Sequence, residues 1–317
     1  MKIEARVAAA IPAIRNQRPD HHMPSDIDES SALHRPDGVT IAYRRWSAGA
    51  GSAGLIVLIH GMASNMTRWS EFVRNTALRQ SWDIVRLDLR GHAGSIVRAR
   101  LGMSLWCDDI AAILEAERHS RAVLIGHCLG ANIALQFAAR HPEQTRGLVL
   151  IEPMLPEALS GPLRTIRALR PCVAALAAGL RVANRMGIYR RRIPPLDLEY
   201  LDRVTRLAMA TDHSAQSLTR RYASPWQDLK FMPSANYLED LLAVSGPLPP
   251  LTKVRAPSLA LLSTGAAFSD LERTRELLAQ LSGCRILTLD SRHWIPTEAP
   301  DAMRQAVEHW CAGLGAG

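Results

Sequence analysis

The segment that most constrains the fold of this chain is residues 123–131, VLIGHCLGA. A short apolar run typical of a buried strand ends at Gly126, and a second glycine, Gly130, opens an apolar stretch with helical spacing. Glycine at these two positions allows a sharp turn from strand to helix and a close approach of the two elements. Cys128 stands at the tip of that predicted turn, so we expect its side chain to project into a cleft.

Apolar runs of the same kind recur along the chain. A continuous apolar run is typical of a strand buried on both faces, and its alternation with helices predicts a mostly parallel sheet covered by helices on both sides. Residues 38–46 alternate apolar and polar side chains, which predicts an early antiparallel strand. The buried-strand runs are 55–59, 83–88, 122–125, 147–151, 258–262 and 285–289, with helices expected near 67–80, 104–118, 129–140 and 297–310.

Residues 154–250 break this alternation. The span is rich in Arg, Leu and Ala and has helical periodicity but no buried-strand run. We interpret it as a helical cap over the carboxyl edge of the sheet, inserted into a core formed by residues 31–153 and 251–317. Residues 1–30 have no periodicity and are interpreted as a flexible leader or as the result of a misassigned start site.

Composition excludes several classes of protein. The five cysteines form no CxxC pair, which argues against a disulfide framework or a zinc site and favours a reducing compartment. The net charge of +8 favours anionic partners, but no nucleic-acid-binding motif is present. Residues 1–25 have no uninterrupted apolar core for a secretory signal, and the longest apolar stretch, 172–180, is too short to span a bilayer. We therefore expect a cytoplasmic protein without a transmembrane segment.

Four landmarks follow one another at the carboxyl ends of predicted strands: His60-Gly61, residues 88–92, Cys128 and His293. With these landmarks, the chain resembles capped α/β-hydrolase-fold proteins from about residue 38 to 310. The resemblance implies an eight-stranded-type, mostly parallel sheet with helices on both faces, a helical cap, and chemistry that needs no cofactor or metal. In that family the residue at the position of Cys128 is usually serine, so this chain departs from the pattern in the attacking atom.

Cys128 and His293 are the candidate nucleophile and base. A helix N-terminus favours a thiolate, and His293 follows the last apolar run, where the family places its catalytic imidazole. Together they have the components of a Cys-His nucleophilic pair. His127 is closer in sequence, but a neighbouring residue on a tight turn points elsewhere. His60 and His92 are interpreted as structural.

The third member of the site has two candidates. Most members of the family carry the acid in the loop corresponding to residues 265–270, where Asp270 is the only carboxylate. However, residues 269–272 fit a capping box with Ser269 as the N-cap, which would place Asp270 in the first turn of a helix and too far along the chain to reach His293. Glu152, at the end of the predicted strand 147–151, is the candidate we favour, because some α/β-hydrolases place their acid there. A site without an acid is the remaining alternative.

By position, the backbone N–H groups of Met62 and Leu129 would form the oxyanion hole. The predicted function is hydrolysis of a carboxylic ester, thioester or lactone, all small-molecule acyl substrates, through an acyl-Cys intermediate. The alternatives are an acyltransferase and a non-catalytic ligand-binding protein on the same scaffold.

The predicted cap contains Arg181, Arg185 and residues 190–192, all arginine, beside apolar segments. The simpler interpretation is a solvated helix face. The alternative is contact with an acyl-thioester carrier or an acidic membrane surface.

Overall fold

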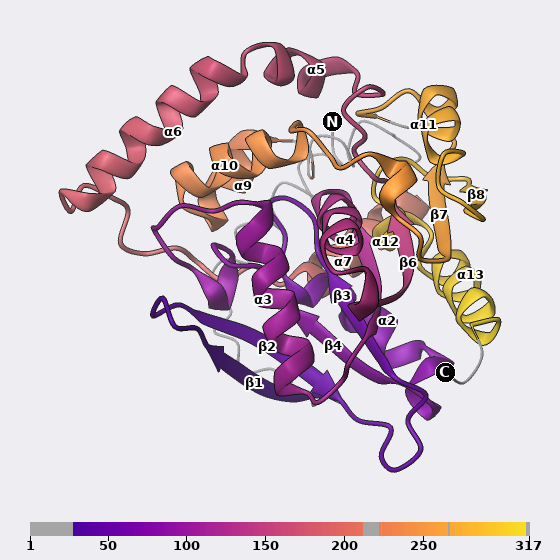
Figure 1. Cartoon of the computed structure of the whole chain (residues 1–317). Coiled ribbons are helices and arrows are strands. Elements are labelled where there is room, and N and C mark those ends of the chain that lie inside the picture. The colour runs from indigo at the N-terminus through magenta and orange to yellow at the C-terminus, as the bar shows by residue number, and fades with distance from the viewer. Residues whose placement is uncertain (1–27, 212–221, 223, 266, 315–317) are drawn as a thin grey trace.

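The computed structural model describes residues 28–211, 222, 224–265 and 267–314. In this part of the chain an eight-stranded sheet has the order β1-β2-β4-β3-β5-β6-β7-β8 (Figure 1). The strands are β1 (Glu29–His34), β2 (Thr40–Trp46), β3 (Leu55–Ile59), β4 (Asp83–Leu87), β5 (Ala122–His127), β6 (Thr145–Ile151), β7 (Ser258–Ser263) and β8 (Arg285–Leu289). β2 is antiparallel to both of its neighbours, and the other strand pairs are parallel. The predicted fold class is confirmed.

Helices cover both faces of this sheet. On one face lie α3 (Met103–Ala116), α4 (Leu129–Arg140) and α11 (Leu271–Leu278), and on the other lie α2 (Ser70–Asn75) and α13 (Pro300–Ala312). All residues of strand β3 are buried, so helices are needed on each face of the sheet to cover its side chains. Val57 belongs to the first apolar core, whereas Ile56 and Leu58 belong to the second, because successive side chains of a strand point to opposite faces.

Shorter elements complete the sheet domain. They are the 3-10 helices η1 (Met66–Trp69), η2 (Ala77–Gln80), η3 (Ala93–Ser95), η4 (Pro142–Gln144) and η5 (Leu251–Lys253), and the short helix α12 (Ile295–Glu298). The helix expected over 67–80 is therefore three short helical segments, η1, α2 and η2. Strand β1 was not predicted, and the sequence-based boundary between residues 30 and 31 falls within it. Residues 1–27 of the expected leader lie outside the described residues.

Helices alone separate β6 from β7 in the described part of the chain. They are α5 (Gly161–Ala168), α6 (Arg170–Arg185), α7 (Leu198–Thr211), α9 (Pro225–Phe231) and α10 (Ser234–Val244). α10 packs against α4 of the sheet domain, and α5 and α6 pack on α10, so that α6 is the outermost layer at the top of Figure 1. α7 packs instead against η1 and α12. None of the described helices is long and apolar enough to cross a membrane.

Candidate active site

Cys128 lies at the tip of the turn between β5 and α4. Its backbone has φ +54° and ψ −115°, a strained conformation for a residue with a side chain. Two hydrogen bonds hold this turn: the Cys128 N–H donates to the Ile151 carbonyl (2.9 Å), and the Cys128 carbonyl accepts from the Ala131 N–H (3.0 Å). The Cys128 side chain lines a cavity, and 9% of the residue is exposed.

The two flanking glycines are required by close backbone contacts. A Cβ at Gly130 would lie 2.3 Å from the Ile59 carbonyl oxygen, and one at Gly126 would lie 2.3 Å from the Gly130 backbone. The α4 N-terminus therefore sits directly against β3 and β5, as the sequence pattern predicted.

His293 and Glu152 meet beside Cys128. The His293 Nδ1 donates to Glu152 Oε2 at 3.3 Å, and both side chains are buried. Glu152 follows β6 with φ +50°, and its other oxygen, Oε1, accepts from the Ser263 N–H at 2.6 Å. Sequence reasoning missed Ser263, although the parallel pairing of β6 with β7 places the ends of these two strands side by side.

The electrostatics couple these three side chains. Burial opposes protonation of His293. The interactions of the imidazole with Cys128, and to a smaller extent with Glu152, outweigh burial and raise the pKa of His293 to about 10. The imidazole is therefore held protonated at neutral pH between a sulfur and a carboxylate.

His127 lines the same cavity, and its ring is hydrogen-bonded to the backbone of the His293 loop. Its Nε2 donates to the His293 carbonyl oxygen at 3.0 Å. Burial, followed by repulsion from His293, holds the pKa of His127 well below its usual value, so the ring is neutral. Phe268 packs edge-on against the His293 ring with centroids 4.9 Å apart. Neither contact was foreseen from the sequence, because both depend on loops that meet only in the folded chain.

Asp270 is not brought to His293. It is the N-cap of α11, and its Oδ1 accepts from the Arg273 N–H at 2.7 Å. The capping box was therefore placed one residue early, because Ser269 precedes the cap and forms an isolated bridge with Leu159. The consequence inferred from the sequence is unchanged, since the Asp270 carboxylate is engaged by the helix.

The loop after β3 passes next to Cys128. A Cβ at Gly61 would lie 3.2 Å from the Cys128 Cβ, so Met62 follows at a point where its N–H is near the cleft. The Leu129 N–H is the first of α4 and has no intrahelical acceptor. Among the described residues neither N–H is hydrogen-bonded to the protein. His60 supports this loop, because its Nε2 accepts from the Leu89 N–H (3.0 Å) and its Nδ1 donates to the Gly61 carbonyl (2.8 Å).

A cavity of about 290 Å³ lies above Cys128 and His293. The inserted helices contribute much of its lining, which is mainly apolar: Leu163, Ile166, Leu198, Leu201, Phe231, Tyr237, Leu241 and Val244. Two charged side chains interrupt it. Arg68 forms an ion pair with Asp202 of α7 (2.5 Å). Burial, followed by repulsion from the nearby Asp240, raises the pKa of Asp228 to about 7.

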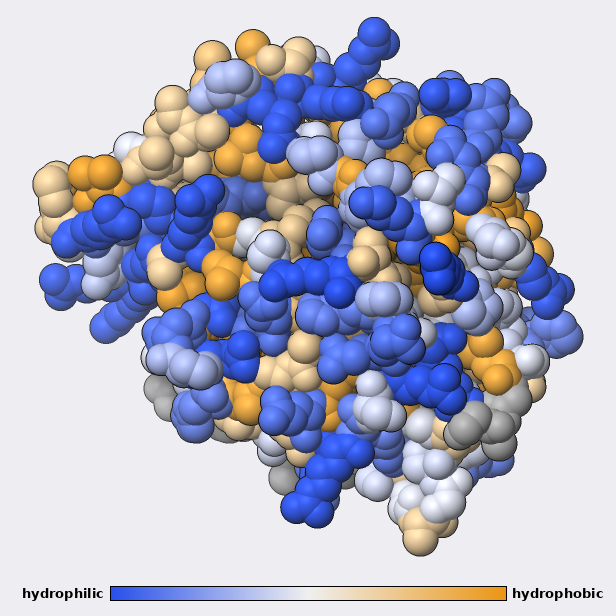
Figure 2. Space-filling model, in the orientation of Figure 1, coloured by the Kyte–Doolittle hydropathy of each residue, from blue (hydrophilic) through white to orange (hydrophobic). Residues whose placement is uncertain are grey.

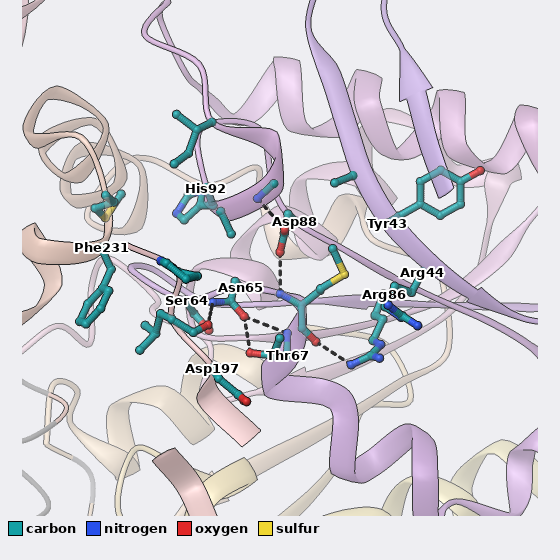
Figure 3. Close-up of a pocket in the computed structure, with 18 of the residues that line it drawn as sticks. Tyr43, Arg44, Ser64, Asn65, Thr67, Arg86, Asp88, His92, Asp197 and Phe231 are labelled. Atoms are coloured by element: carbon teal, nitrogen blue, oxygen red, sulfur yellow. Dashed lines mark hydrogen bonds between the residues drawn. The ribbon is translucent and has the colours of Figure 1, made fainter. Parts of the chain in front are cut away.

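A second cavity, of about 530 Å³, adjoins the first, and its lining includes the polar side chains of Asn65, Thr67, Arg86 and Asp88 (Figure 3). The two share Ala63, Ser64, Leu196 and Phe231 in their linings. In Figure 3 Asp88 accepts the N–H groups of Met66 (2.8 Å) and Gly94 (2.9 Å), so the segment 88–92 holds the surrounding loops in place. Within the described residues, no group of three His, Cys, Asp or Glu side chains could hold a metal ion.

Comparison with known proteins agrees with this fold. Residues 54–300 match the model of the alpha/beta hydrolase fold family. A Haemophilus influenzae protein assigned as an esterase/lipase is 23% identical over 262 residues, which cover 81% of this chain and 82% of that protein. An uncharacterized protein of Mycobacterium tuberculosis is 33% identical over 110 residues, and there the match spans only about a third (32%) of the relative.

Solved structures show the same fold. The enol-lactonase of Burkholderia xenovorans superposes with a TM-score of 0.64 and 20% identity, over 89% of this chain and all (100%) of the enzyme. The matched residues include the strands β3 to β8, the turn at Cys128 and the loop of His293. The chain therefore belongs to the α/β-hydrolase fold family.

Proposed function

We propose that this protein is a hydrolase of a carboxylic ester, thioester or lactone that works through an acyl-Cys128 intermediate. The observation that carries the proposal is the continuous contact from Cys128 through His293 to Glu152 beneath an apolar cavity. A protonated imidazole beside a sulfur is the arrangement that makes a thiol nucleophilic near neutral pH. The relationship to an assigned esterase/lipase and the fold shared with an enol-lactonase support the same class of reaction.

In the proposed first step, the Cys128 thiolate attacks the carbonyl carbon and a C–S bond forms. The electron pair of the C=O bond moves to oxygen, where the N–H groups of Met62 and Leu129 would stabilise the negative charge. The tetrahedral intermediate then collapses, the bond to the leaving group breaks, and the His293 imidazolium gives its proton to the departing oxygen or sulfur.

Deacylation uses the same groups. Neutral His293 takes a proton from water as the water oxygen attacks the thioester carbonyl. The acid is released, Cys128 leaves as thiolate, and the protonated imidazole is restored. We assign Glu152 the role of orienting His293, because its Oε2 accepts from Nδ1 and so directs Nε2 toward the nucleophile. The position of Asp270 at a helix cap supports this choice.

We also propose that the helices between β6 and β7 act as a cap, with domains divided at residues 153/154 and 250/251. Their side chains line the cavity that contains Cys128, so they would select the acyl group.

Acyl transfer to another acceptor is the second candidate. The adjoining cavity of about 530 Å³ favours it, because it could hold an acceptor alcohol beside the acyl-enzyme. Hydrolysis and transfer are separated by adding alcohols to the assay: a transferase partitions the acyl group to the alcohol, whereas a hydrolase releases the acid alone.

The test is turnover of p-nitrophenyl acyl esters by the wild type, Cys128→Ala and Cys128→Ser. We expect Cys128→Ala to lose activity to the background level while keeping its melting temperature. Full turnover by Cys128→Ala would show that the nucleophile is wrongly assigned. Ligand binding without turnover by the wild type across a panel of esters, thioesters and lactones would favour a non-catalytic binding protein.

A further inference from the structure

The excess positive charge of the chain lies in one segment. The chain carries 38 Lys and Arg against 30 Asp and Glu, a net charge of +8. Residues 158–196 contain eight arginines and no Lys, Asp or Glu, so the rest of the chain balances 30 basic residues with 30 acidic ones. This segment forms α5, α6 and the loop that follows them.

Most of this charge is not neutralised by the protein. Of the eight arginines, only Arg181 forms an ion pair within the described residues, with Glu239 of α10. Arg170 donates to Ser245 Oγ (3.2 Å), and Arg190 donates to the Met232 carbonyl (3.0 Å), so both keep their net charge. Arg185, Arg191 and Arg192 are exposed.

The outward face of α6 is apolar rather than charged. Ala177 and the paired Arg181 face inward and are buried. The opposite side presents Leu176 (57% exposed), Val182 (52%) and Met186 (66%), a stripe with helical spacing that Ile188 (64%) continues beyond the helix. In Figure 2 this helix appears as a hydrophobic edge at the upper left with hydrophilic side chains beside it. The expectation of a solvated helix face accounts for the exposed arginines but not for these apolar side chains.

We infer that the outer face of α5, α6 and the loop through residue 192 docks on an anionic lipid bilayer. An amphipathic helix that exposes large apolar side chains and is flanked by arginines lies in the headgroup region, where the apolar face is buried and the cations meet anionic lipids. A second copy of the chain is disfavoured as the occupant, because a symmetric contact would bring together two faces that each carry the exposed Arg185, Arg191 and Arg192. An acidic protein would satisfy the arginines but leave Leu176, Val182 and Met186 against a polar surface.

The position of this face relates it to the catalytic cavity. Leu163 and Ile166 of α5 line the cavity that contains Cys128, while α6 covers the outer side of the same layer. Docking would therefore place the cavity next to the bilayer, a source of acyl lipids. Only the use of the bilayer as a source of acyl lipids rests on the proposed function.

The experiment is cosedimentation of the full chain with vesicles of phosphatidylcholine, with and without phosphatidylglycerol. We expect binding only to the vesicles that contain phosphatidylglycerol, weakening as salt is raised. The triple variant Arg185→Gln, Arg191→Gln, Arg192→Gln should bind on the order of 100-fold more weakly, since each arginine near an anionic surface contributes about 1 kcal/mol.

The matched control removes the same charge elsewhere. Arg121, Arg255 and Arg285 are exposed and precede or open strands at the opposite edge of the sheet, so their triple Gln variant should bind as the wild type does. The apolar contribution is tested by Leu176→Gln with Val182→Gln, which should weaken binding about tenfold or more. The control is Leu287→Gln, a side chain that is 40% exposed on β8.

Equal losses in the two arginine triples would mean non-specific charge attraction and would overturn the proposal, as would an absence of binding by the wild type. Concentration-dependent self-association that Leu176→Gln and Val182→Gln abolish, without vesicle binding, would instead identify a second copy as the occupant. Binding by Cys128→Ala should equal that of the wild type, so failure of docking and failure of the proposed chemistry are distinguishable. Turnover of a soluble ester should be unchanged in the Leu176→Gln, Val182→Gln variant.

Discussion

Replacement of Glu152 by Gln tests the arrangement of the site in most detail, because the two carboxylate oxygens have different partners. Oε1 accepts from the Ser263 N–H at 2.6 Å, and Oε2 accepts from His293 Nδ1 at 3.3 Å. In Glu152→Gln the amide oxygen is expected to stay with the Ser263 N–H, since only an acceptor fits there. The amide NH₂ then faces His293 and forces Nδ1 to be an acceptor, so that the remaining proton lies on Nε2.

The size of the effect follows from charge and distance. Opposite charges about 4 Å apart interact by about 4 kcal/mol at an effective dielectric constant of about 20, and the pair at 3.3 Å is both closer and buried. A loss of that size from the transition state corresponds to about a thousandfold in rate. Because a thiol depends less on an orienting acid than a hydroxyl does, we expect kcat/KM to fall about 10²- to 10³-fold.

The assay compares kcat/KM on a p-nitrophenyl ester for Glu152→Gln and for Asp270→Asn as the matched control. Asn is as good an N-cap as Asp, so Asp270→Asn should keep both its activity and its melting temperature. Circular dichroism shows whether each variant is folded. A Glu152→Gln enzyme within about twofold of the wild type, together with a large loss in Asp270→Asn, would refute the assignment of the acid.

Three further predictions follow from the same contacts. Asp270→Ala should lower the free energy of unfolding by about 0.5–2 kcal/mol through loss of the cap, measured by urea denaturation, with kcat unchanged; a loss of kcat would place Asp270 in the site. The pKa of His293 is raised to about 10, so its contribution to stability is complete below about pH 6.5 and lost as the pH rises through about 10. The stability difference between the wild type and Glu152→Gln should therefore shrink between about pH 7 and pH 10.5, and a difference independent of pH would contradict the coupling. Gly130→Ala places a methyl group 2.3 Å from the Ile59 carbonyl oxygen. It should lower the free energy of unfolding by at least the roughly 1–3 kcal/mol typical of an overpacked core, or prevent folding, as judged by thermal denaturation.

The sheet could be predicted from the sequence because its strands are continuous apolar runs between glycines and helices. The wholly buried run Leu55–Ile59 is the clearest case. Strand β1 has no such signal, because ESSALH is an edge strand whose side chains are mainly exposed or half-buried. β1 is recognised as a strand only by its antiparallel pairing with β2, and that pairing is seen only in the folded chain.

Site residues could be predicted where a reactive side chain follows a predicted strand. Contacts between loops that are distant in the sequence could not be predicted. Cys128 and His293 follow predicted strands, and Glu152 was favoured over Asp270 by a capping argument. The partners that hold them, Ser263 and His127, act through backbone contacts that carry no sequence pattern. The orientation of α6 was equally hidden, since a buried Arg181 paired with Glu239 turns the apolar side outward.

The most direct test of covalent chemistry at Cys128 is the mass of the intact protein after rapid mixing with acyl esters and thioesters. Cys172 is exposed, so the measurement belongs in a Cys172→Ser background, with peptide mapping to locate the adduct. We predict a mass increase of one acyl group on the peptide containing Cys128, which decays as the acid is released and is absent in Cys128→Ala. Turnover that continues in Cys128→Ala, with no acyl adduct in the parent, would contradict the account.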